Sequence, residues 1–260
     1  MAFGKGCHLH LIDGSAFIFR AYHALPPLTR KSDGLPVGAV SGFVNMLQRY
    51  VETNTGPDAA THVAVIFDKG SHTFRNDMYD LYKANRDAMP EDLRPQMPLT
   101  RDATRAFNIA CEEIEGFEAD DIIATLAHQA RDAGGRVTIL SSDKDLMQLV
   151  GGGVEMLDPM KNKRIDNDGV VEKFGVGPER VVDVQALAGD SVDNVPGVNK
   201  VGPKTAVKWL DQYGTLANII ENAGEFKGKV GEYLREAVAH LPLSYDLVTI
   251  KCDLDLDCSP

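Results

Sequence analysis

The chain has little of what several common kinds of site require. It contains four cysteines, none of which forms a Cys-x-x-Cys pair or joins histidines at the spacing of a zinc site. We therefore expect reduced, structural thiols and no zinc. No apolar run approaches the ~20 residues that span a bilayer, and residues 1–10 lack the pattern of a signal peptide. These absences predict a cytoplasmic protein.

Basic residues are also in short supply. Lysine and arginine number 27 against 38 aspartates and glutamates, so the net charge is −11. Such an excess of acid at first argues against a nucleic-acid partner. Acids gathered at a metal site would contribute to this total, however, while basic patches elsewhere could still bind phosphate. The positions of the charges therefore decide the question.

The 260 residues, 43% of them hydrophobic, suffice for one large domain or two closely joined ones. Short apolar segments alternate with helical patterns along the first two thirds of the chain. The predicted strands cover residues 7–12, 61–67, 110–114 and 136–141, and a hairpin is expected at about 154–165. This alternation predicts an α/β fold with a central, mostly parallel twisted sheet and helices on both faces. The remainder reads as mostly helical.

Carboxylates follow these predicted strands. Glu118, Asp120 and Asp121 stand at the first turn of a predicted helix, where acids are ordinary because they complement the helix dipole. Asp13, Asp68, Asp143 and Asp145 follow other strands, and Asp190 and Asp193 stand at a helix end. Ligand sites of open α/β sheets form outside the carboxyl ends of the strands. We therefore expect these acids to meet at one rim of the sheet.

Nine carboxylates at one place would repel each other strongly unless cations were present. Oxygen ligands alone select hard ions such as Mg²⁺ or Mn²⁺. Two such ions ~3.5–4 Å apart clamp the attacking and leaving oxygens of an in-line phosphoryl displacement. The pattern predicts phosphodiester hydrolysis with two or more metal ions. The alternative is that chance pairs arise in an acid-rich chain, but this does not explain acids at several strand ends.

Two further segments indicate phosphate binding. Residues 197–206 read as a glycine-bracketed hairpin leading into a helix, with Lys200, Lys204 and Lys208 nearby. Residues 69–98 interleave arginines and lysines with tyrosines, as single-strand binders do. The alternatives are a glycine-rich helical turn with solvated lysines and a mobile surface loop with scattered charge.

Seven motifs then follow one another in a familiar order. They are residues 11–28, 67–68, 74–86, 118–121, 143–145, 189–198 and 201–206. Together they resemble the 5′-nuclease domain of bacterial DNA polymerase I, within the flap endonuclease superfamily. The resemblance covers nearly the whole chain.

The resemblance assigns roles to individual residues. The first metal would be held by Asp13, Asp68, Glu118 and Asp120, with Asp121 beside them, and the second by Asp143, Asp145, Asp190 and Asp193. The catalytic candidates are Asp13, Asp68, Glu118, Asp120, Asp121, Lys83 and Arg86. The DNA-binding candidates are Arg20, Arg75, Tyr82, Lys83, Arg86, Gly197, Lys200, Val201, Gly202, Lys204 and Thr205. Lys83 and Arg86 would engage the scissile phosphate, and Tyr82 would stack on the unpaired strand. K⁺ is expected at the hairpin of residues 197–206.

The resemblance also implies an activity and a domain organisation. The family removes 5′ flaps and RNA primers, and acts as a 5′→3′ exonuclease, in Okazaki-fragment processing and repair. We expect a nuclease core at residues 1–175, with a helical arch at about 69–98. A helical region at 176–260 would carry a helix–hairpin–helix element at about 185–212. Its partner would be DNA with a 5′ flap, nick or primer end in the bacterial cytoplasm near the nucleoid. We expect a monomer, tethered to a polymerase module in a full-length protein.

Two alternatives remain open at the level of sequence. A non-catalytic DNA-binding module could use the hairpin and the basic segment without cleaving. A ribonuclease of the PIN type would share the acidic rim of the sheet, although the predicted duplex-holding hairpin argues against it.

Overall fold

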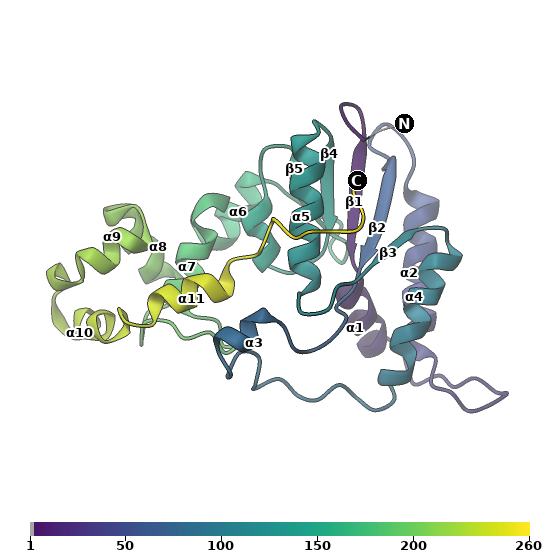
Figure 1. Ribbon diagram of the computed structural model, residues 1–260, viewed down its shortest axis with the longest axis horizontal. Coiled ribbons are helices and arrows are strands. Elements are labelled where there is room, and N and C mark those ends of the chain that lie inside the picture. The colour runs from purple at the N-terminus through teal and green to yellow at the C-terminus, as the bar shows by residue number, and fades with distance from the viewer. Residues whose placement is uncertain (1–2) are drawn as a thin grey trace.

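The computed structural model describes residues 3–260, and in this range one sheet forms the centre of the molecule (Figure 1). Its strands lie in the order β3-β2-β1-β4-β5-β6. Their bounds are β1 (His8–Asp13), β2 (His62–Ile66), β3 (Ala110–Glu112), β4 (Arg136–Leu140), β5 (Val154–Asp158) and β6 (Lys163–Ile165). Every pair is parallel except β5–β6, which is antiparallel. The predicted parallel sheet and hairpin are therefore confirmed.

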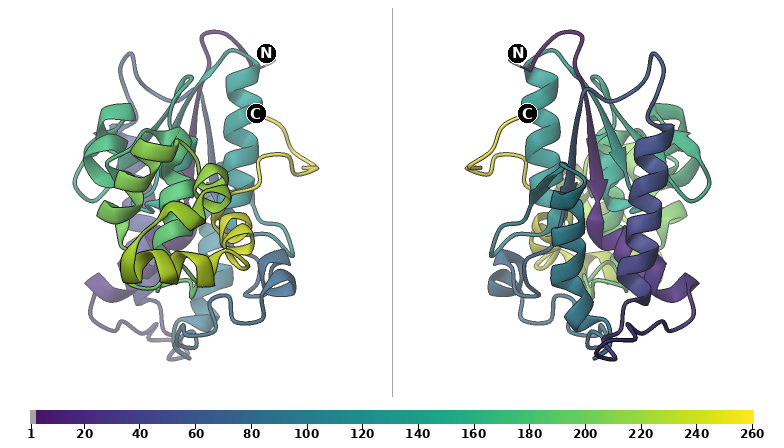
Figure 2. Two further views of the ribbon diagram at one scale, coloured as in Figure 1. Left: turned by 90° about the vertical axis from the view of Figure 1, so that its left-hand side faces the viewer. Right: turned by 90° about the vertical axis from the view of Figure 1, so that its right-hand side faces the viewer.

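Helices cover both faces of the sheet, as Figure 2 shows with the strands seen from the side. Leu9 and Leu11 of β1 belong to the core under α5 (Ala119–Asp132). Ile12, which points the other way because side chains alternate along a strand, belongs to a core with Phe43 and Leu47. That second core lies under α1 (Gly14–Ala24), α2 (Gly38–Thr53) and α4 (Met97–Ala106).

The chain beyond the hairpin is mostly helical, as expected. Its helices are α6 (Asn167–Phe174), α7 (Val181–Ala188), α8 (Pro203–Tyr213), α9 (Leu216–Glu221), α10 (Gly228–Ala237) and α11 (Leu241–Val248). They enclose a core of their own, which includes Leu187, Leu210 and Leu234. Short 3₁₀ turns cover Arg94–Gln96, Asp145–Leu149, Pro178–Arg180 and Ala223–Glu225. Figure 1 places α8, α9 and α10 at the opposite end of the molecule from α2 and α4.

The connection between α7 and α8 crosses itself at two glycines. A Cβ atom on Gly197 would lie 2.3 Å from the backbone nitrogen of Gly189, a distance no side chain permits. Gly189 itself has φ = 72°, in the left-handed region that favours glycine. The crossing closes a turn in which Asp190 pairs with Val195, and this turn presents Asp190 and Asp193.

The segment of residues 69–98 is not the helical arch that the sequence predicts. Its helical parts are α3 (Phe74–Met78), the turn Arg94–Gln96 and the first two residues of α4, and the rest is loop and turn. Tyr79 is extended and Lys83 adopts φ = 55°, so the helix cannot continue. Lys83 and Arg86 of this segment instead pair with Glu118 and Asp193. The segment therefore contains less helix than the sequence predicts.

The last residues of the chain run in extended form across α5 (Figure 1). Cys252, Leu254, Leu256 and Cys258 pack against the core under α5, whereas the intervening residues are exposed. The backbone N–H of Leu254 donates to Thr125 Oγ1 at 3.2 Å. In the described range, no helix combines the length and apolarity that crossing a membrane requires.

Candidate active site

A cleft of about 300 Å³ opens at the carboxyl ends of β1, β2 and β4. Among its lining residues are all the predicted carboxylates except Asp121: Asp13, Asp68, Glu118, Asp120, Asp143, Asp145, Asp190 and Asp193. They come from three strand ends, the start of α5 and the α7–α8 connection. Residues far apart in sequence thus converge as the sheet-rim argument predicts.

Hydrogen bonds hold the two carboxylates nearest the centre of the sheet. Asp13 caps α1, where Oδ1 accepts from the N–H of Ala16 at 2.9 Å and Oδ2 from Ser141 Oγ at 2.7 Å. Asp68 accepts from Ala119 N at 2.8 Å and from Ser15 Oγ at 2.6 Å. Both side chains are therefore fixed in direction by their neighbours, which is what a preorganised site needs.

The start of α5 aims two further acids into the cleft. Glu118 is the N-cap residue of this helix, and Asp120 lies in its first turn. The capping role and the site role therefore coincide. On the other side, Asp143 Oδ1 accepts from the N–H of Asp145 at 2.9 Å, and Asp145 Oδ1 accepts from Gln185 Nε2 at 2.5 Å.

Burial and mutual repulsion make several of these acids hard to ionise. Burial raises the pKa of Asp13 to about 6, with Asp68 and Asp143 adding repulsion against the bonds from Ala16 and Ser141. Burial and then Asp143 raise the pKa of Asp145 to about 7. The pKa of Asp120 is also raised, first by burial and then by Asp143 and Asp13. The cleft therefore holds more negative charge than its protein surroundings compensate.

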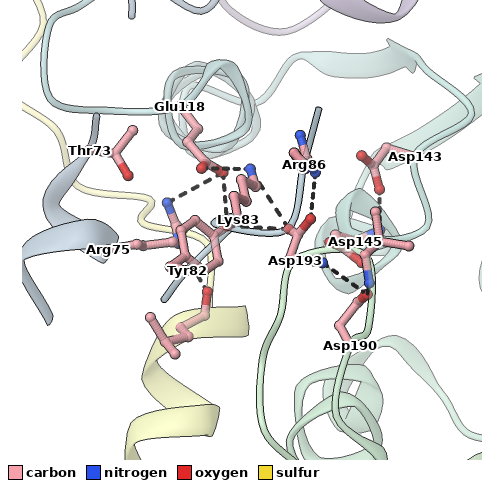
Figure 3. A network of polar contacts seen from close by, with 12 residues as sticks. Thr73, Arg75, Tyr82, Lys83, Arg86, Glu118, Asp143, Asp145, Asp190 and Asp193 are labelled. Carbon is pink, nitrogen blue, oxygen red and sulfur yellow. Dashed lines mark hydrogen bonds and ion pairs between the residues drawn. The ribbon is translucent and has the colours of Figure 1, made fainter. Parts of the chain in front are cut away.

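Three basic side chains supply part of the compensation (Figure 3). Lys83 Nζ lies 2.6 Å from Glu118 Oε1 and 3.7 Å from Asp193 Oδ2. Arg86 also pairs with Asp193, and Lys144 pairs with Asp190. Burial lowers the pKa of Lys83, but the attraction of Glu118 and Asp193 outweighs it and the net pKa is raised. Burial raises the pKa of Asp190, but the bond and charge of Lys144 together with the N–H groups of Val192 and Asp193 outweigh burial, and the net pKa is lowered.

The donor set fits a hard divalent cation in its chemistry. Its ligands are carboxylate oxygens alone, and the raised pKa values of Asp13 and Asp145 mark charge that a cation would stabilise. Within residues 3–260, no three acidic, histidine or cysteine side chains stand close enough together to hold an ion as they lie. Lys83, Arg86 and Lys144 occupy positions among the acids, so binding an ion requires these contacts to loosen.

The structure does not support two of the predicted roles, because the side chains of Asp121 and Arg75 are bound to each other. Asp121 is 0% exposed and Arg75 is 2% exposed. Two bonds of 2.8 Å join the guanidinium to the carboxylate, and Arg75 Nε donates to the carbonyl of Leu247 at 3.0 Å. Asp121 also accepts the N–H of Lys251 at 2.9 Å. Asp121 and Arg75 are therefore both committed to this network, and neither lines the cleft.

Tyr82 does not offer a stacking surface, contrary to the prediction. Its side chain is 4% exposed, and its hydroxyl lies 3.4 Å from Glu118 Oε2 and 3.3 Å from Asp193 Oδ2. Burial, with repulsion from these acids, raises the pKa of the hydroxyl far above its usual range. Tyr82 therefore supports the wall on which Lys83 stands; the lysine Nζ lies 5.0 Å from its ring centroid.

The other predicted DNA contacts lie outside the cleft. Arg20 is half-buried on α1. Lys200, Gly202 and Lys204 are exposed around the first turn of α8, and Thr205 is half-buried there. Val201 is buried at 5% exposure and anchors this turn to the helical core. Gly197 belongs to the backbone crossing.

Sequence reasoning missed several residues of the site. Ser15, Ser141 and Gln185 position acids by hydrogen bonds, and Lys144 neutralises one. Phe19 lines the cleft at 40% exposure. Ser15 and Lys144 stand within the motifs Asp-Gly-Ser and Asp-Lys-Asp, so a signal existed for these two. Gln185 carried none, because only the packing of α7 brings it to the rim.

Comparison with known protein families decides the relationship. A family model for the 5′-3′ exonuclease N-terminal resolvase-like domain matches residues 8–175, and one for the 5′-3′ exonuclease C-terminal SAM fold matches residues 176–260. The chain belongs to the 5′-3′ exonuclease family. The first model alone covers more than half of the residues.

Named relatives of this 5′-3′ exonuclease family member include complete polymerases and a shorter protein. DNA polymerase I of Rhizobium leguminosarum is 57% identical over 97% of this chain, which spans 25% of that protein. The 5′-3′ exonuclease of Aquifex aeolicus is 39% identical over 96% of this chain and 84% of its own length. The chain thus spans about a quarter of the polymerase relatives.

Solved structures of lower identity share the fold. A structure of divalent metal ions (zinc) bound to T5 5′-exonuclease has a TM-score of 0.77 at 24% identity, over 93% of this chain and 89% of that one. The bacteriophage T5 flap endonuclease in a complex with DNA and metal ions has a TM-score of 0.75 at 23% identity, over 93% and 88%. At these identities the likeness establishes the α/β architecture.

Proposed function

We propose that the chain is a metal-dependent, structure-specific 5′ nuclease that hydrolyses phosphodiester bonds of DNA at 5′ flaps, nicks and primer ends. One observation carries the proposal: carboxylates from three strand ends, α5 and the α7–α8 connection line one cleft, with Lys83 and Arg86 beside them. Membership of the 5′-3′ exonuclease family supports it.

Two groups of acids would hold the ions, for which Mg²⁺ or Mn²⁺ is the expected identity. Asp13, Asp68, Glu118 and Asp120 form the first group, and Asp143, Asp145, Asp190 and Asp193 the second. When bound, such ions lower the pKa of water to supply hydroxide and stabilise the leaving oxygen. Asp121 is left out of the first group because its oxygens are occupied by Arg75.

The basic residues of the cleft would orient the scissile phosphate. Lys83 Nζ and the Arg86 guanidinium now contact Glu118 and Asp193. A phosphate entering the cleft offers these cations equivalent anionic oxygens, and arginine pairs with phosphate in a two-pronged geometry. The Tyr82 ring packs beside the Lys83 ammonium, so Tyr82 would position Lys83 without contacting the phosphate.

The first turn of α8 would bind the duplex backbone away from the cleft. The exposed N-terminus of this helix, Lys200 and Lys204 are suited to a phosphate, and K⁺ bridging to phosphate there remains part of the proposal. DNA held at α8 and in the cleft would have its 5′ strand cut at a fixed distance from the duplex. We also propose primer removal and repair in the bacterial cytoplasm, as a monomeric unit tethered to a polymerase module.

The deciding experiment incubates purified protein with a labelled 5′-flap duplex and Mg²⁺ or Mn²⁺. We expect cleavage near the base of the flap and none with EDTA. An intact flap in the presence of either ion contradicts the proposal and favours a binding module. Single-stranded RNA serves as the matched substrate, because preferential cleavage of RNA would instead favour a ribonuclease of the PIN type.

A further inference from the structure

A second groove joins the acid cleft at Asp143. It has a volume of about 490 Å³ and shares Ser142, Asp143 and Lys144 with the cleft. Because β5 is parallel to β4, its last residue Asp158 reaches the same rim of the sheet. The groove thus continues from the acid cleft along the same rim of the sheet, over the β5–β6 hairpin and α6.

The basic residues that line this groove are all lysines. Lys144, Lys161, Lys163 and Lys173 line it, against the acids Asp143, Asp158 and Glu172. In a chain with a net charge of −11 this is a local reversal of sign. Of the acids, Asp143 faces the cleft as well, and Asp158 Oδ1 accepts the N–H groups of Met160 at 2.8 Å and Lys161 at 3.3 Å.

The lysines outside the cleft are available to a polyanion. The side chain of Lys161 is 77% exposed and lies 3.7 Å from Asp158, and that of Lys163 is 52% exposed and lies 2.6 Å from Glu172. Exposed ion pairs of this kind contribute little to stability. They therefore exchange readily for phosphate oxygens.

The groove lies on the side of the cleft that carries Asp143 and Lys144, away from Lys83 and Arg86, which do not line it. Figure 3 places Lys83 and Arg86 beside Glu118 and Asp193, whereas Asp143 stands on the other side. A nucleic-acid strand whose phosphate sits between them must leave the cleft in two directions. One direction follows the segment that carries Lys83 and Arg86, and the other leads to Lys161, Lys163 and Lys173.

We propose that this lysine groove, made by the β5–β6 hairpin and α6, binds the phosphate backbone of the nucleic-acid substrate where it leaves the cleft past Asp143. The proposal rests on the nuclease function proposed above. Contacts of this type are independent of sequence and set the register of a substrate on the protein. The groove thereby extends the binding site beyond the scissile phosphate.

The test replaces Lys161, Lys163 and Lys173 with glutamine together and measures binding of a 5′-flap duplex in EDTA over a range of salt concentrations. Each phosphate contact adds ~0.9 to the slope of log K against log salt for duplex and ~0.7 for single strands. We expect the slope to fall by about 2–3 and the affinity at low salt to fall on the order of tenfold. An unchanged slope and affinity overturn the proposal.

A matched control changes the same charge elsewhere. Lys5, Lys227 and Lys229 are exposed and line neither the cleft nor the groove, and their replacement by glutamine should leave the slope close to that of the unmodified protein. An equal fall in both triple variants means that only net charge matters, which also overturns the proposal. Thermal unfolding confirms that both variants are folded.

Cleavage separates a failure of this proposal from a failure of the nuclease function. Single-turnover cleavage with saturating enzyme and Mg²⁺ should be unchanged in the groove variant, because none of the three lysines lines the acid cleft. If the unmodified protein does not cleave, the nuclease function fails whatever the binding shows. If it cleaves, and the groove variant binds as tightly as it does, the groove proposal fails alone.

Neutral methylphosphonate linkages locate the contact on the substrate. On the side of the scissile phosphate that enters the groove, they should weaken binding by the unmodified protein and have little further effect on the groove variant. If the methylphosphonates weaken binding by the groove variant as much as they weaken binding by the unmodified protein, the two effects are independent, and a direct contact is contradicted.

Discussion

Asp120 combines a position in the first turn of α5 with a pKa raised by burial and by Asp143 and Asp13. Replacing it with asparagine keeps the shape and removes the charge. We expect cleavage to fall by roughly 10²–10³-fold or more, as when one preorganised electrostatic group is lost. Duplex binding in EDTA should be retained or improve, since a negative charge is gone. Loss of binding together with cleavage would contradict the role assigned to Asp120.

Arg75 illustrates the opposite case, a cation near the site that serves the fold. Arg75→Met leaves the buried carboxylate of Asp121 without its cationic partner, which typically costs about 3–5 kcal/mol of unfolding free energy. Urea denaturation measures this loss. The double variant Arg75→Met, Asp121→Leu should recover much of it because no unpaired charge remains. Equal destabilisation of the single and double variants would mean that packing, and not charge, is what Arg75 supplies.

Residue roles of this kind could not be predicted from sequence. Arg75, Tyr82 and Lys83 stand in one motif and all suit nucleic-acid binding in composition. Only Lys83 reaches the cleft wall, because α3 turns Arg75 inward to Asp121 and the loop buries Tyr82. The direction of a side chain depends on packing partners more than 30 residues away, which spacing along the chain does not encode.

At the level of elements, His10 links β1 to α2 through a 2.8 Å bond between its Nδ1 and the hydroxyl of Tyr50. Burial, and then His8, Arg164 and Arg136, lower the pKa of His10 to about 4. An unfolded histidine binds a proton below pH ~6.5, so the unfolded state takes up more protons and the folded state loses stability as pH falls from there to about 4.

We therefore expect His10→Gln to flatten the loss of unfolding free energy between pH 6.5 and 4. His23→Gln, at an exposed position on α1, is the matched control and should leave the loss in place. Chemical denaturation at several pH values makes the comparison. A steep loss that persists in His10→Gln would assign the acid sensitivity to another group.

The α7–α8 connection has no room for one added methyl group at Gly197. Gly197→Ala places a Cβ atom 2.3 Å from the Gly189 nitrogen, so the crossing must open. Overpacking of this kind costs typically 1–3 kcal/mol, and the same opening would displace Asp190 and Asp193. We expect lower stability and slower cleavage, measured by thermal unfolding and single-turnover rates. Gly224→Ala, where nothing lies within 4 Å of the new Cβ, should be neutral.

The elements themselves were largely predictable. Strands that are buried on both faces read as apolar runs, and β1, β2 and β4 were found within a residue or two of their bounds. The helical arch was not, because Lys83 adopts φ = 55° in a loop held by Glu118 and Asp193. Local propensity does not register such tertiary contacts.

At the scale of the molecule, the C-terminal segment continues from α11 of the helical region onto the core under α5. Its alternate residues Cys252, Leu254, Leu256 and Cys258 pack on the core under α5. Removing residues 251–260 also removes the backbone bond from Lys251 to Asp121. We expect a loss of about 2–4 kcal/mol in unfolding free energy, from the apolar area that becomes exposed. The outward-facing Asp253, Asp255 and Asp257 provide the control, since changing all three to asparagine should be nearly neutral.

The convergence of the acids was predictable because it follows from one rule of parallel sheets applied to several strand ends. Placing Asp13, Asp68 and Asp143 at one rim needed only the positions of the strands and their parallel direction. The exclusion of Asp121, by contrast, depends on Arg75 and on the backbone of Lys251, which approach it from opposite ends of the chain. The topology could therefore be predicted from the sequence, whereas it could not be predicted which of the adjacent acids line the cleft and which one pairs with Arg75.

Lys83, Arg86 and Lys144 pair with acids of the cleft. At the proposed centre, metal ions and these three side chains would therefore compete for the same carboxylates. The carboxylates that would hold the ions are the ones that these tethered cations now neutralise, so a bound ion would take the place of a cation there. The released ammonium or guanidinium would stay attached to the wall and could receive a phosphate. Binding of the metal and release of the phosphate-binding cations would then be coupled, because both depend on the same carboxylates.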